Sequence, residues 1–520
     1  MAHELIFVAL FLVATAVALV ARALRMPYTV ALVVTGLTLG ATRVLSPPHL
    51  TQELLYAVFL PGLVFEAAFH LDFKKFWANK LAIHALAVPG LIVAISLTAL
   101  ILVPVANSLH FVEGFTFAHG LVFAALLAAT DPIAVVGLFK SLGAPRRLMV
   151  LVEGESLLND GTAVVVFSLV LAFAGGRSLS AAEVGLTFVR TVGGGLLVGA
   201  AIGYATSKAT QRIEDAMIEI TLTTIAAYGS FAVAERLHLS GVIATVAAGM
   251  LCGNYGARTG MSPSTRLAVE SFWEYVAFAL NSVVFLLIGF EVRLGALLHA
   301  WKPVLVAFVA VTAARAVVVS LVGLALRGTR ERFPASWVAV LTWGGLRGGL
   351  SMVLALALPR ELAHRELIVT MTFGVVVLSI LGQGLTMAPL LRRLGLVAAG
   401  TDRVRYEVVR GEQRATTAAL AALEQAARGG GLSEQLLADL RGEYQQRLAT
   451  SDEHLREMHL AHEALRREER HALARQLLLV EKDAAMLAHR EGAIGAEAVE
   501  EILRDVDARL VALEDDSDAH

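Results

Sequence analysis

The sequence predicts an all-α polytopic membrane protein with about thirteen transmembrane helices and a helical soluble C-terminal tail. We also expect inverted six-helix repeats and two broken helices that cross. Three observations predict this fold. The 520 residues are 57% hydrophobic and only 17% charged, and the mean hydropathy is +0.68, which excludes an ordinary soluble domain. Thirteen apolar stretches approach the roughly 20 residues that a spanning helix needs. Two of them are interrupted near their centres by proline or glycine.

The expected spans follow one another along the chain, with polar loops between them. They are residues 5–23, 27–43, 52–70, 81–106, 119–140, 148–174, 185–207, 217–236, 239–255, 269–292, 302–327, 335–359 and 365–392. Alternate loops carry fifteen and eight Lys and Arg residues, so the richer set is expected to be cytoplasmic and the N-terminus outside. The first segment lacks a basic n-region, so we expect it to remain as a span and not to be cleaved as a signal peptide.

The composition changes sharply near residue 398, which divides the chain into a membrane domain, 1–397, and a tail, 398–520. The tail holds 16 Lys and Arg against 25 Asp and Glu, whereas the membrane part holds 27 against 20. Helices are expected at Asp402 to Arg428, Ser433 to about Arg490 and around Leu503 to Leu513. The tail helices are expected to pack on each other or on a second copy, and a regulatory or partner-binding role is the alternative.

Polar residues in the middle of two apolar stretches are the main functional signal. Glu155 to Asp160 lie within Leu148–Ala174, and Thr130-Asp131-Pro132 lies at the centre of Gly120–Phe139. Asp131 and Asp160 are each about 12 residues from one end of their span, or roughly 18 Å at 1.5 Å per residue. Both carboxylates are therefore expected near the bilayer centre, where ionisable groups are costly and usually functional.

The two halves of the membrane part show a corresponding pattern. Pairing spans 1–6 with 8–13 matches the span broken at Pro132 to the span that contains the glycine-dense stretch Trp343–Gly349. Interrupted helices at corresponding positions of an inverted repeat indicate an ion site near the midplane. Exposed backbone at that depth is tolerated where it lines a cavity.

The chemistry of these residues suits a small hard cation and a proton. Ser156 and Asp160 are four residues apart and share one helix face, so both can point at one ion with Asp131 and its neighbouring carbonyls. Burial disfavours the charged form of a carboxylate, so a cation and protons would compete for it. If the site can move across the membrane only when it carries a cation or a proton, this competition couples cation flow to proton flow. Asn159 cannot ionise, which argues for one cation per proton.

Other charged residues at this depth need partners. Arg315 and Arg347 lie centrally in their spans, and we expect them to pair with acids because an unpaired buried charge is costly. Glu155 is interpreted as a permanent ion-pair partner in preference to a ligand of the transported ion. Glu66 has two open interpretations, as a residue of the ion pathway or as a partner of Arg347.

At these residues the chain resembles the sodium/proton exchanger branch of the cation:proton antiporter superfamily, the branch with Asn-Asp at the site. The matching stretches are AATDPIAVVGLFKSLGAPRRLMVLVEGESLLNDGTAVVVFSL, AERLHLSGVIATVAAGMLCGN, FWEYVAFALNSVVFLLIGFEV, ARAVVV, TWGGLRGGLSMVLALALP and FLPGLVFEAAF. They extend over nearly the whole membrane part, and the paired TDP and GESLLND blocks are highly specific.

The resemblance implies a homodimer in which a core domain moves like an elevator against a dimerisation domain. It implies Asp160 as the essential carboxylate, with Asn159, Thr130, Asp131 and Ser156 as further site residues. It also implies that Glu155 pairs with Arg315 and that Arg347 stabilises the helix crossing. The implied activity is electroneutral exchange of Na⁺ or Li⁺ for H⁺ in pH homeostasis, with Na⁺ held by Asp160, Asp131, Ser156 and Thr130.

Three other activities stay open at this point. They are potassium/proton exchange at the same site, a gated cation channel, and a signalling protein whose tail reports ion binding. The channel is disfavoured because the charges lie on interrupted helices and not in a repeated pore loop.

No enzymatic constellation, cofactor or nucleic-acid partner is expected, and the single Cys252 excludes an intrachain disulfide. The expected surroundings are the lipids of the inner (plasma) membrane, with a cytoplasmic tail that has an unidentified ligand or partner.

Overall fold

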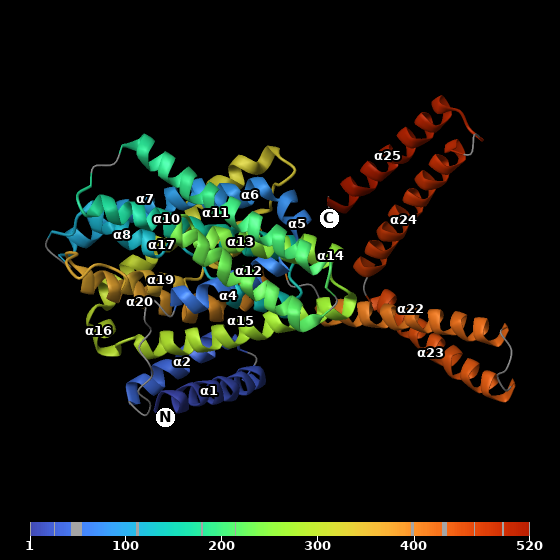
Figure 1. Cartoon of the computed structure of the whole chain (residues 1–520), viewed down its shortest axis with the longest axis horizontal. Coiled ribbons are helices and arrows are strands. Elements are labelled where there is room, and N and C mark those ends of the chain that lie inside the picture. The colour runs from blue at the N-terminus through green and yellow to red at the C-terminus, as the bar shows by residue number, and fades with distance from the viewer. Residues whose placement is uncertain are drawn as a thin grey trace. The chain divides into compact units, whose positions relative to one another are not determined.

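The computed structural model contains helices, and no strand occurs among the residues that it describes. Those residues are 1–520 without 1, 25, 43–54, 111–113, 178–179, 214, 397–399, 429–433, 462, 491–492 and 519–520. The chain forms two compact units, Met1–Ala398 and Ala399–His520 (Figure 1).

Seven helical stretches of the first unit, within the described residues, are long and apolar enough to cross a membrane. Their bounds are Lys80–Ser108, Arg146–Ala174, Ala181–Thr210, Ala216–Arg236, Ser264–Glu291, Trp301–Gly328 and Arg365–Arg393. They correspond to α6 (Lys80–Ala85) with α7 (Leu91–Ser108), α10 (Arg146–Ala174), α11 (Ala181–Thr210), α12 (Ala216–Arg236), α15 (Pro263–Glu291), α17 (Trp301–Ala325), and α20 (Arg365–Leu378) with α21 (Gly384–Arg393).

Further helices occupy the remaining apolar stretches of this unit. They are α1 (Ala2–Leu24), α2 (Tyr28–Thr42), α4 (Leu60–His70), α8 (Phe117–Leu126), α9 (Ile133–Leu142), α13 (Gly241–Leu251), α18 (Ala335–Trp343) and α19 (Gly349–Leu356). Three short helices serve as connections: α5 (Phe73–Ala78), α14 (Ala257–Thr259) and α16 (Leu294–His299). Single π-helical turns occur at Leu55–Phe59, Leu86–Gly90, Cys252–Gly256 and Ser379–Gln383, and a 3₁₀ turn at Leu326–Gly328.

Glycines allow several helix pairs to pack backbone to backbone. Gly195, Gly199 and Gly203 are spaced four residues apart on α11, and all three face α13. A Cβ atom at Gly195 would lie 2.6 Å from the carbonyl oxygen of Ser240, and one at Gly203 would lie 2.8 Å from Cα of Ala248. Close packing of small residues is how helices associate where lipid removes the hydrophobic driving force.

Many large hydrophobic side chains are exposed on this unit, as expected of a surface that faces lipid. Large hydrophobic side chains point outwards, among them Leu12, Leu186, Leu197 and Met217. Some polar side chains are, by contrast, buried between helices, where the backbone and neighbouring side chains can satisfy them: Thr130, Glu155, Ser156, Asn159 and Arg347.

The second unit consists of two helical hairpins (Figure 1). In one, α22 (Gly400–Arg428) packs on α23 (Glu434–Ala461), and the Gln413 side-chain amide donates to Asp452 Oδ1 at 2.6 Å. In the other, α24 (Glu463–Arg490) packs on α25 (Ala496–Asp518), and Arg509 pairs with Glu481 at 3.1 Å.

The expected helix from Ser433 to about Arg490 is therefore described as two helices, α23 and α24. Ser433 and residue 462, which lies between the two helices, are outside the described residues.

Candidate ion-binding site

The first predicted interruption is present between α8 and α9. Residues 127–132 leave the helical conformation, and Pro132, which has no backbone N–H, is the N-cap residue of α9. Asp131 caps this second half-helix, since its Oδ1 accepts a hydrogen bond from the Ile133 amide at 3.0 Å. Asp131 is thus held by the end of α9 at the depth where the chain unwinds.

The second interruption separates α18 from α19, and it lies against the first. The Asp131 amide donates to the carbonyl oxygen of Leu346 at 2.8 Å, which joins the two unwound segments directly. The Arg347 amide donates to Ser379 Oγ at 3.1 Å. These two amides and the Leu346 carbonyl, which the broken helices expose, are therefore paired with protein, as backbone groups away from water must be.

Arg347 lies by the C-terminal end of one half-helix, and Asp131 lies at the N-terminal end of another. Arg347 Nη1 donates to the carbonyl oxygens of Ala128 and Ala129, at 3.0 and 3.1 Å, just beyond the C-terminus of α8. Asp131 lies at the N-terminus of α9 and beside Gly348, the N-cap residue of α19. A cation at a C-terminus and an anion at an N-terminus are each favourable with the helix dipole.

This arrangement corrects one expectation. Arg347 was expected to pair with an acid, but its guanidinium binds backbone carbonyls. The reason is that an unwound helix end supplies carbonyl oxygens that need donors, and these compete with a carboxylate for the guanidinium.

Side chains of α10 hold the first unwound segment in place. Ser156 Oγ donates to the Thr130 carbonyl oxygen. Asn159 Nδ2 donates to the Ala128 carbonyl oxygen at 2.9 Å and to Thr130 Oγ1 at 3.3 Å. The structure thus brings Thr130, Ser156 and Asn159 together although the first is 26 and 29 residues from the other two.

A cavity of about 590 Å³ opens onto this group. Thr130, Asp131, Ser156 and Asp160 all line it, so four of the sequence-predicted ligands face one space. They offer two carboxylates, two hydroxyls and nearby carbonyl oxygens, which are the ligands that a hard cation prefers. Asn159 lies on the other side of this group, where it supports the segment that carries Thr130.

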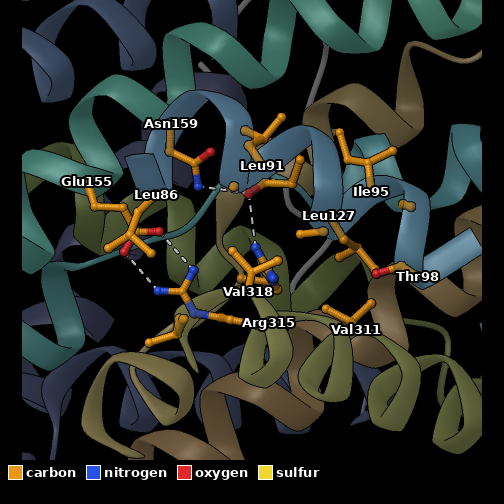
Figure 2. A pocket seen from close by; sticks show the side chains of 16 residues that line it. Leu86, Leu91, Ile95, Thr98, Leu127, Glu155, Asn159, Val311, Arg315 and Val318 are labelled. Atoms are coloured by element: carbon orange, nitrogen blue, oxygen red, sulfur yellow. Dashed lines mark hydrogen bonds and ion pairs between the residues drawn. The ribbon is translucent and has the colours of Figure 1, made fainter. Parts of the chain in front are cut away.

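Glu155 and Arg315 form a buried ion pair next to the site (Figure 2). Arg315 Nη1 and Nη2 donate to the two oxygens of Glu155, at 2.8 and 2.9 Å, and its Nε donates to the Leu341 carbonyl oxygen at 2.8 Å. Glu155 is only 3% exposed. Both carboxylate oxygens of Glu155 thus accept hydrogen bonds from Arg315 in this structure.

Glu66 pairs with His70 and not with Arg347. Its Oε1 lies 3.2 Å from His70 Nδ1, one helical turn further along α4, while Arg347 binds the Ala128 and Ala129 carbonyls. The alternative in which Glu66 pairs with Arg347 is therefore wrong. Glu66 lines the large cavity, together with His70 and Glu153.

Two glycines and two cavity residues were not assigned roles from the sequence. A Cβ atom at Gly348 would lie 2.5 Å from Cβ of Asp131, and one at Gly345 would lie 2.7 Å from Cζ of Arg315. Both glycines belong to the glycine-dense stretch already noted, but only the fold shows which side chains occupy the space above them. No sequence signal indicated that His70 and Glu153 face the cavity.

The matches to known proteins fit this geometry. Residues 7–393 match the family described as sodium/hydrogen exchanger, transmembrane, so the chain belongs to that family of secondary transporters. A low-affinity Na⁺/H⁺ antiporter, NhaS1 of Synechocystis sp., is 39% identical over 77% of this chain and 76% of its own. The Na⁺/H⁺ antiporter NhaH of Halobacillus dabanensis is 34% identical over 76% of this chain and 99% of its own.

A solved structure shares the fold. The sodium proton antiporter MjNhaP1 of Methanocaldococcus jannaschii superposes with a TM-score of 0.62 at 18% identity, covering 76% of this chain and 98% of its own. The helical membrane unit of this chain thus shares its overall fold with that structure.

Proposed function

We propose that the protein is a secondary active antiporter that exchanges Na⁺, with Li⁺ as a substitute, for H⁺ by alternating access of a site centred on Asp160. The observation that best supports this proposal is that Asp160 and Asp131 line one cavity beside the unwound backbone of Thr130, within an apolar helical unit. The relatives described as Na⁺/H⁺ antiporters support sodium as the cation.

In this proposal Asp160, Asp131, Ser156 and Thr130 hold the transported ion. Ser156 Oγ donates its hydrogen to the Thr130 carbonyl, which leaves the lone pairs of the hydroxyl free for a cation. Asp160 Oδ1 has no hydrogen-bond partner among the described residues, so it is available to bind either Na⁺ or a proton. The two compete for Asp160, and that competition couples the two flows.

The proposed stoichiometry is one Na⁺ for one H⁺, which makes exchange electroneutral. Asn159 carries no titratable proton, and Glu155 is committed to Arg315. Asp131 has its Oδ1 engaged by the Ile133 amide at the start of α9, whereas Asp160 Oδ1 has no hydrogen-bond partner among the described residues. Asp160 is then the carboxylate that binds Na⁺ and a proton in turn.

We further propose that thirteen spans are arranged as two inverted six-helix repeats around one additional helix, in the inner (plasma) membrane. The N-terminus then lies outside and the tail is cytoplasmic. Each protomer of a homodimer moves its core domain like an elevator, surrounded by lipid. Glu66 lies on the route between the cytoplasm and Asp160.

The tail is proposed as a regulatory or dimer-stabilising domain with an unidentified ligand. NhaH of Halobacillus dabanensis is matched over 99% of its own length by only 76% of this chain, which supports transport without a full tail.

The test uses purified protein in liposomes with an acidic interior and a pH-sensitive dye inside. Na⁺, Li⁺ or K⁺ is added outside, with and without a valinomycin and potassium clamp. The variants are Asp160→Asn and, as a matched control, Asp505→Asn on the tail. We expect Na⁺-driven proton efflux that is independent of membrane potential. This efflux should persist in the Asp505→Asn control and be lost in Asp160→Asn. A response to K⁺ alone, or a clamp-dependent current, would contradict the proposal.

A further inference from the structure

Two histidines, His119 and His364, meet at the start of the helix that leads to the first interruption. His119 lies in the first turn of α8 and His364 is the N-cap residue of α20, and their rings are perpendicular, with centroids 5.0 Å apart. Both rings also lie against Phe115, at 5.6 and 6.1 Å between centroids. Both histidines are partly exposed, so protons from water reach this histidine pair.

Both helices lead from the histidine pair to the helix crossing. α8 has 10 residues, or roughly 15 Å at 1.5 Å per residue, and is followed by the Ala128 and Ala129 carbonyls that bind the Arg347 side chain. α20 is followed by Ser379, whose Oγ accepts a hydrogen bond from the Arg347 amide. The histidine pair therefore joins two helices whose other ends both hold Arg347.

The cap of α8 requires a neutral His119. The backbone N–H of Thr116, the N-cap residue, donates to His119 Nδ1 at 3.1 Å, and Thr116 Oγ1 lies 3.0 Å from the same atom. A backbone N–H is only a donor, so Nδ1 carries a lone pair and the ring proton is on Nε2. Glutamate or glutamine usually makes this contact in a capping box. A second proton on His119 would remove the acceptor and place a positive charge at the N-terminus of α8, where the helix dipole disfavours it.

Acid also acts on the contact between the two rings. Histidine is the side chain that gains its charge between about pH 8 and about pH 5. A charge on both rings would place two positive groups 5.0 Å apart, where they repel each other. No acid among the described residues forms an ion pair with either ring, so nothing there offsets this repulsion.

The surrounding helices bring few other charges to this end of α8. α7 and α19, which pack on α8, contain no titratable residue, and those of α10 lie at Asp160 or before it. α20 carries Arg365, which donates to two backbone carbonyls, and Glu366. The adjoining loops contain His110, Glu113, Arg360 and Glu361. Among the residues that the structure describes, none of these is bonded to the histidine pair, so its response to pH depends on its own two rings and on the N-cap residue.

We propose that the histidine pair is a pH-sensitive contact that holds the ends of α8 and α20 together while both rings are neutral. Protonation breaks the cap of α8, separates the two rings and loosens the helix crossing that positions Thr130 and Asp131. In the topology proposed above, this end of α8 faces outwards, so acid outside the cell lowers the affinity for Na⁺. That last step rests on the proposed function, whereas the cap and the ring contact do not.

The first test measures the cap directly, by amide hydrogen exchange and mass spectrometry on the full-length protein in lipid nanodiscs. The peptide around residues 115–122 is compared at about pH 7.5 and about pH 5.5, on either side of the ordinary histidine pKa of about 6.5, after correction for the intrinsic pH dependence of exchange. The variant His119→Gln keeps an acceptor for the N-cap amide and takes up no proton. His299→Gln is the matched control, because His299 is exposed, lies on α16 and contacts a carbonyl oxygen of its own helix.

We expect acid to lower the protection of this peptide several-fold in the wild type and in His299→Gln, and to leave it unchanged in His119→Gln. Equal losses in all three proteins, or no loss in the wild type, would overturn the proposal. If His119→Gln does not fold, His364→Asn takes its place, since asparagine tolerates the left-handed backbone of this position, with φ 58°, and removes one of the two charges. It should lose less protection in acid than the wild type, and an equal loss would contradict the ring contact.

The second test asks whether the contact regulates the ion site. In right-side-out membrane vesicles, external Na⁺ drives proton release, and the KM for Na⁺ is measured at the same two pH values of the medium. Protons compete with Na⁺ at Asp160 in every variant, so the comparison between variants isolates the histidine pair. We expect acid to raise the KM several-fold more in the wild type and in His299→Gln than in His119→Gln.

The same rise of the KM in all three proteins would overturn the regulatory role. Absence of Na⁺-driven proton movement from all of them, at both pH values, would contradict the proposed function instead. The hydrogen-exchange measurement then still decides whether the histidine pair is a pH-sensitive contact.

Discussion

Gly348→Ala is the substitution that most directly tests the geometry of the helix crossing. Gly348 has φ −126° and ψ −157°, which an alanine can adopt, so the requirement for glycine is one of space. An added Cβ would lie 2.5 Å from Cβ and 2.9 Å from Cγ of Asp131, and closer still to Oδ2. Either the Asp131 side chain or α19 must move.

The expected magnitude follows from what the move disrupts. Overpacking a tight site costs about 1–3 kcal/mol. The hydrogen bond between Asp131 and the Ile133 amide, which has a charged acceptor, is worth about 1.5–3 kcal/mol if lost. If this cost destabilises the Na⁺-bound state by about 1.4 kcal/mol or more relative to the empty state, the affinity for Na⁺ drops at least tenfold.

The assay is the KM for Na⁺ in the liposome experiment, measured beside the melting temperature of the purified protein. Gly349→Ala is the control, because its Cβ would meet only Val284 Cγ1 at 2.8 Å and Ile288 Cδ1 at 3.8 Å, the ends of apolar side chains. We expect a raised KM in Gly348→Ala and a near-normal KM in Gly349→Ala. Wild-type KM and stability in Gly348→Ala would refute the reasoning.

Three further changes have defined outcomes. Asp160→Asn should abolish exchange while size-exclusion chromatography still shows folded protein; full transport would remove the central claim. Glu155→Gln should lower the unfolding free energy by about 3–5 kcal/mol, because Arg315 keeps a buried charge without its partner, measured as a fall in melting temperature. Removing residues 399–520 should leave Na⁺-driven proton movement intact, with a changed pH response; complete loss of transport would show that the tail is part of the machinery.

Much of the site followed from local sequence. Pro132 and the glycines after Trp343 indicated where two helices unwind, and both interruptions are present. The four-residue spacing of Ser156 and Asp160 set them on one face, and both line the large cavity. Such features depend on residues near one another in the chain, so helix periodicity and proline chemistry are enough to predict them.

What could not be predicted depends on partners distant in sequence. Arg347 binds carbonyls rather than an acid because unwinding after α8 exposes those oxygens at its position. Glu66 pairs with His70. Their four-residue spacing on α4 allows this contact but does not require it. The need for glycine at position 348 appears only when Asp131 is placed above it.

The crossing of the two broken helices also constrains how the chain is made. The hydrogen bond from Arg347 to Ala128 joins positions 219 residues apart. At a synthesis rate of about 5–20 residues per second, roughly 10–40 seconds pass between the emergence of its two partners. During that interval the Ala129 carbonyl has not yet met Arg347, and the Asp131 amide has not yet met the Leu346 carbonyl. The first half of the protein must therefore stay near water, or in contact with the insertion machinery, until the second half arrives.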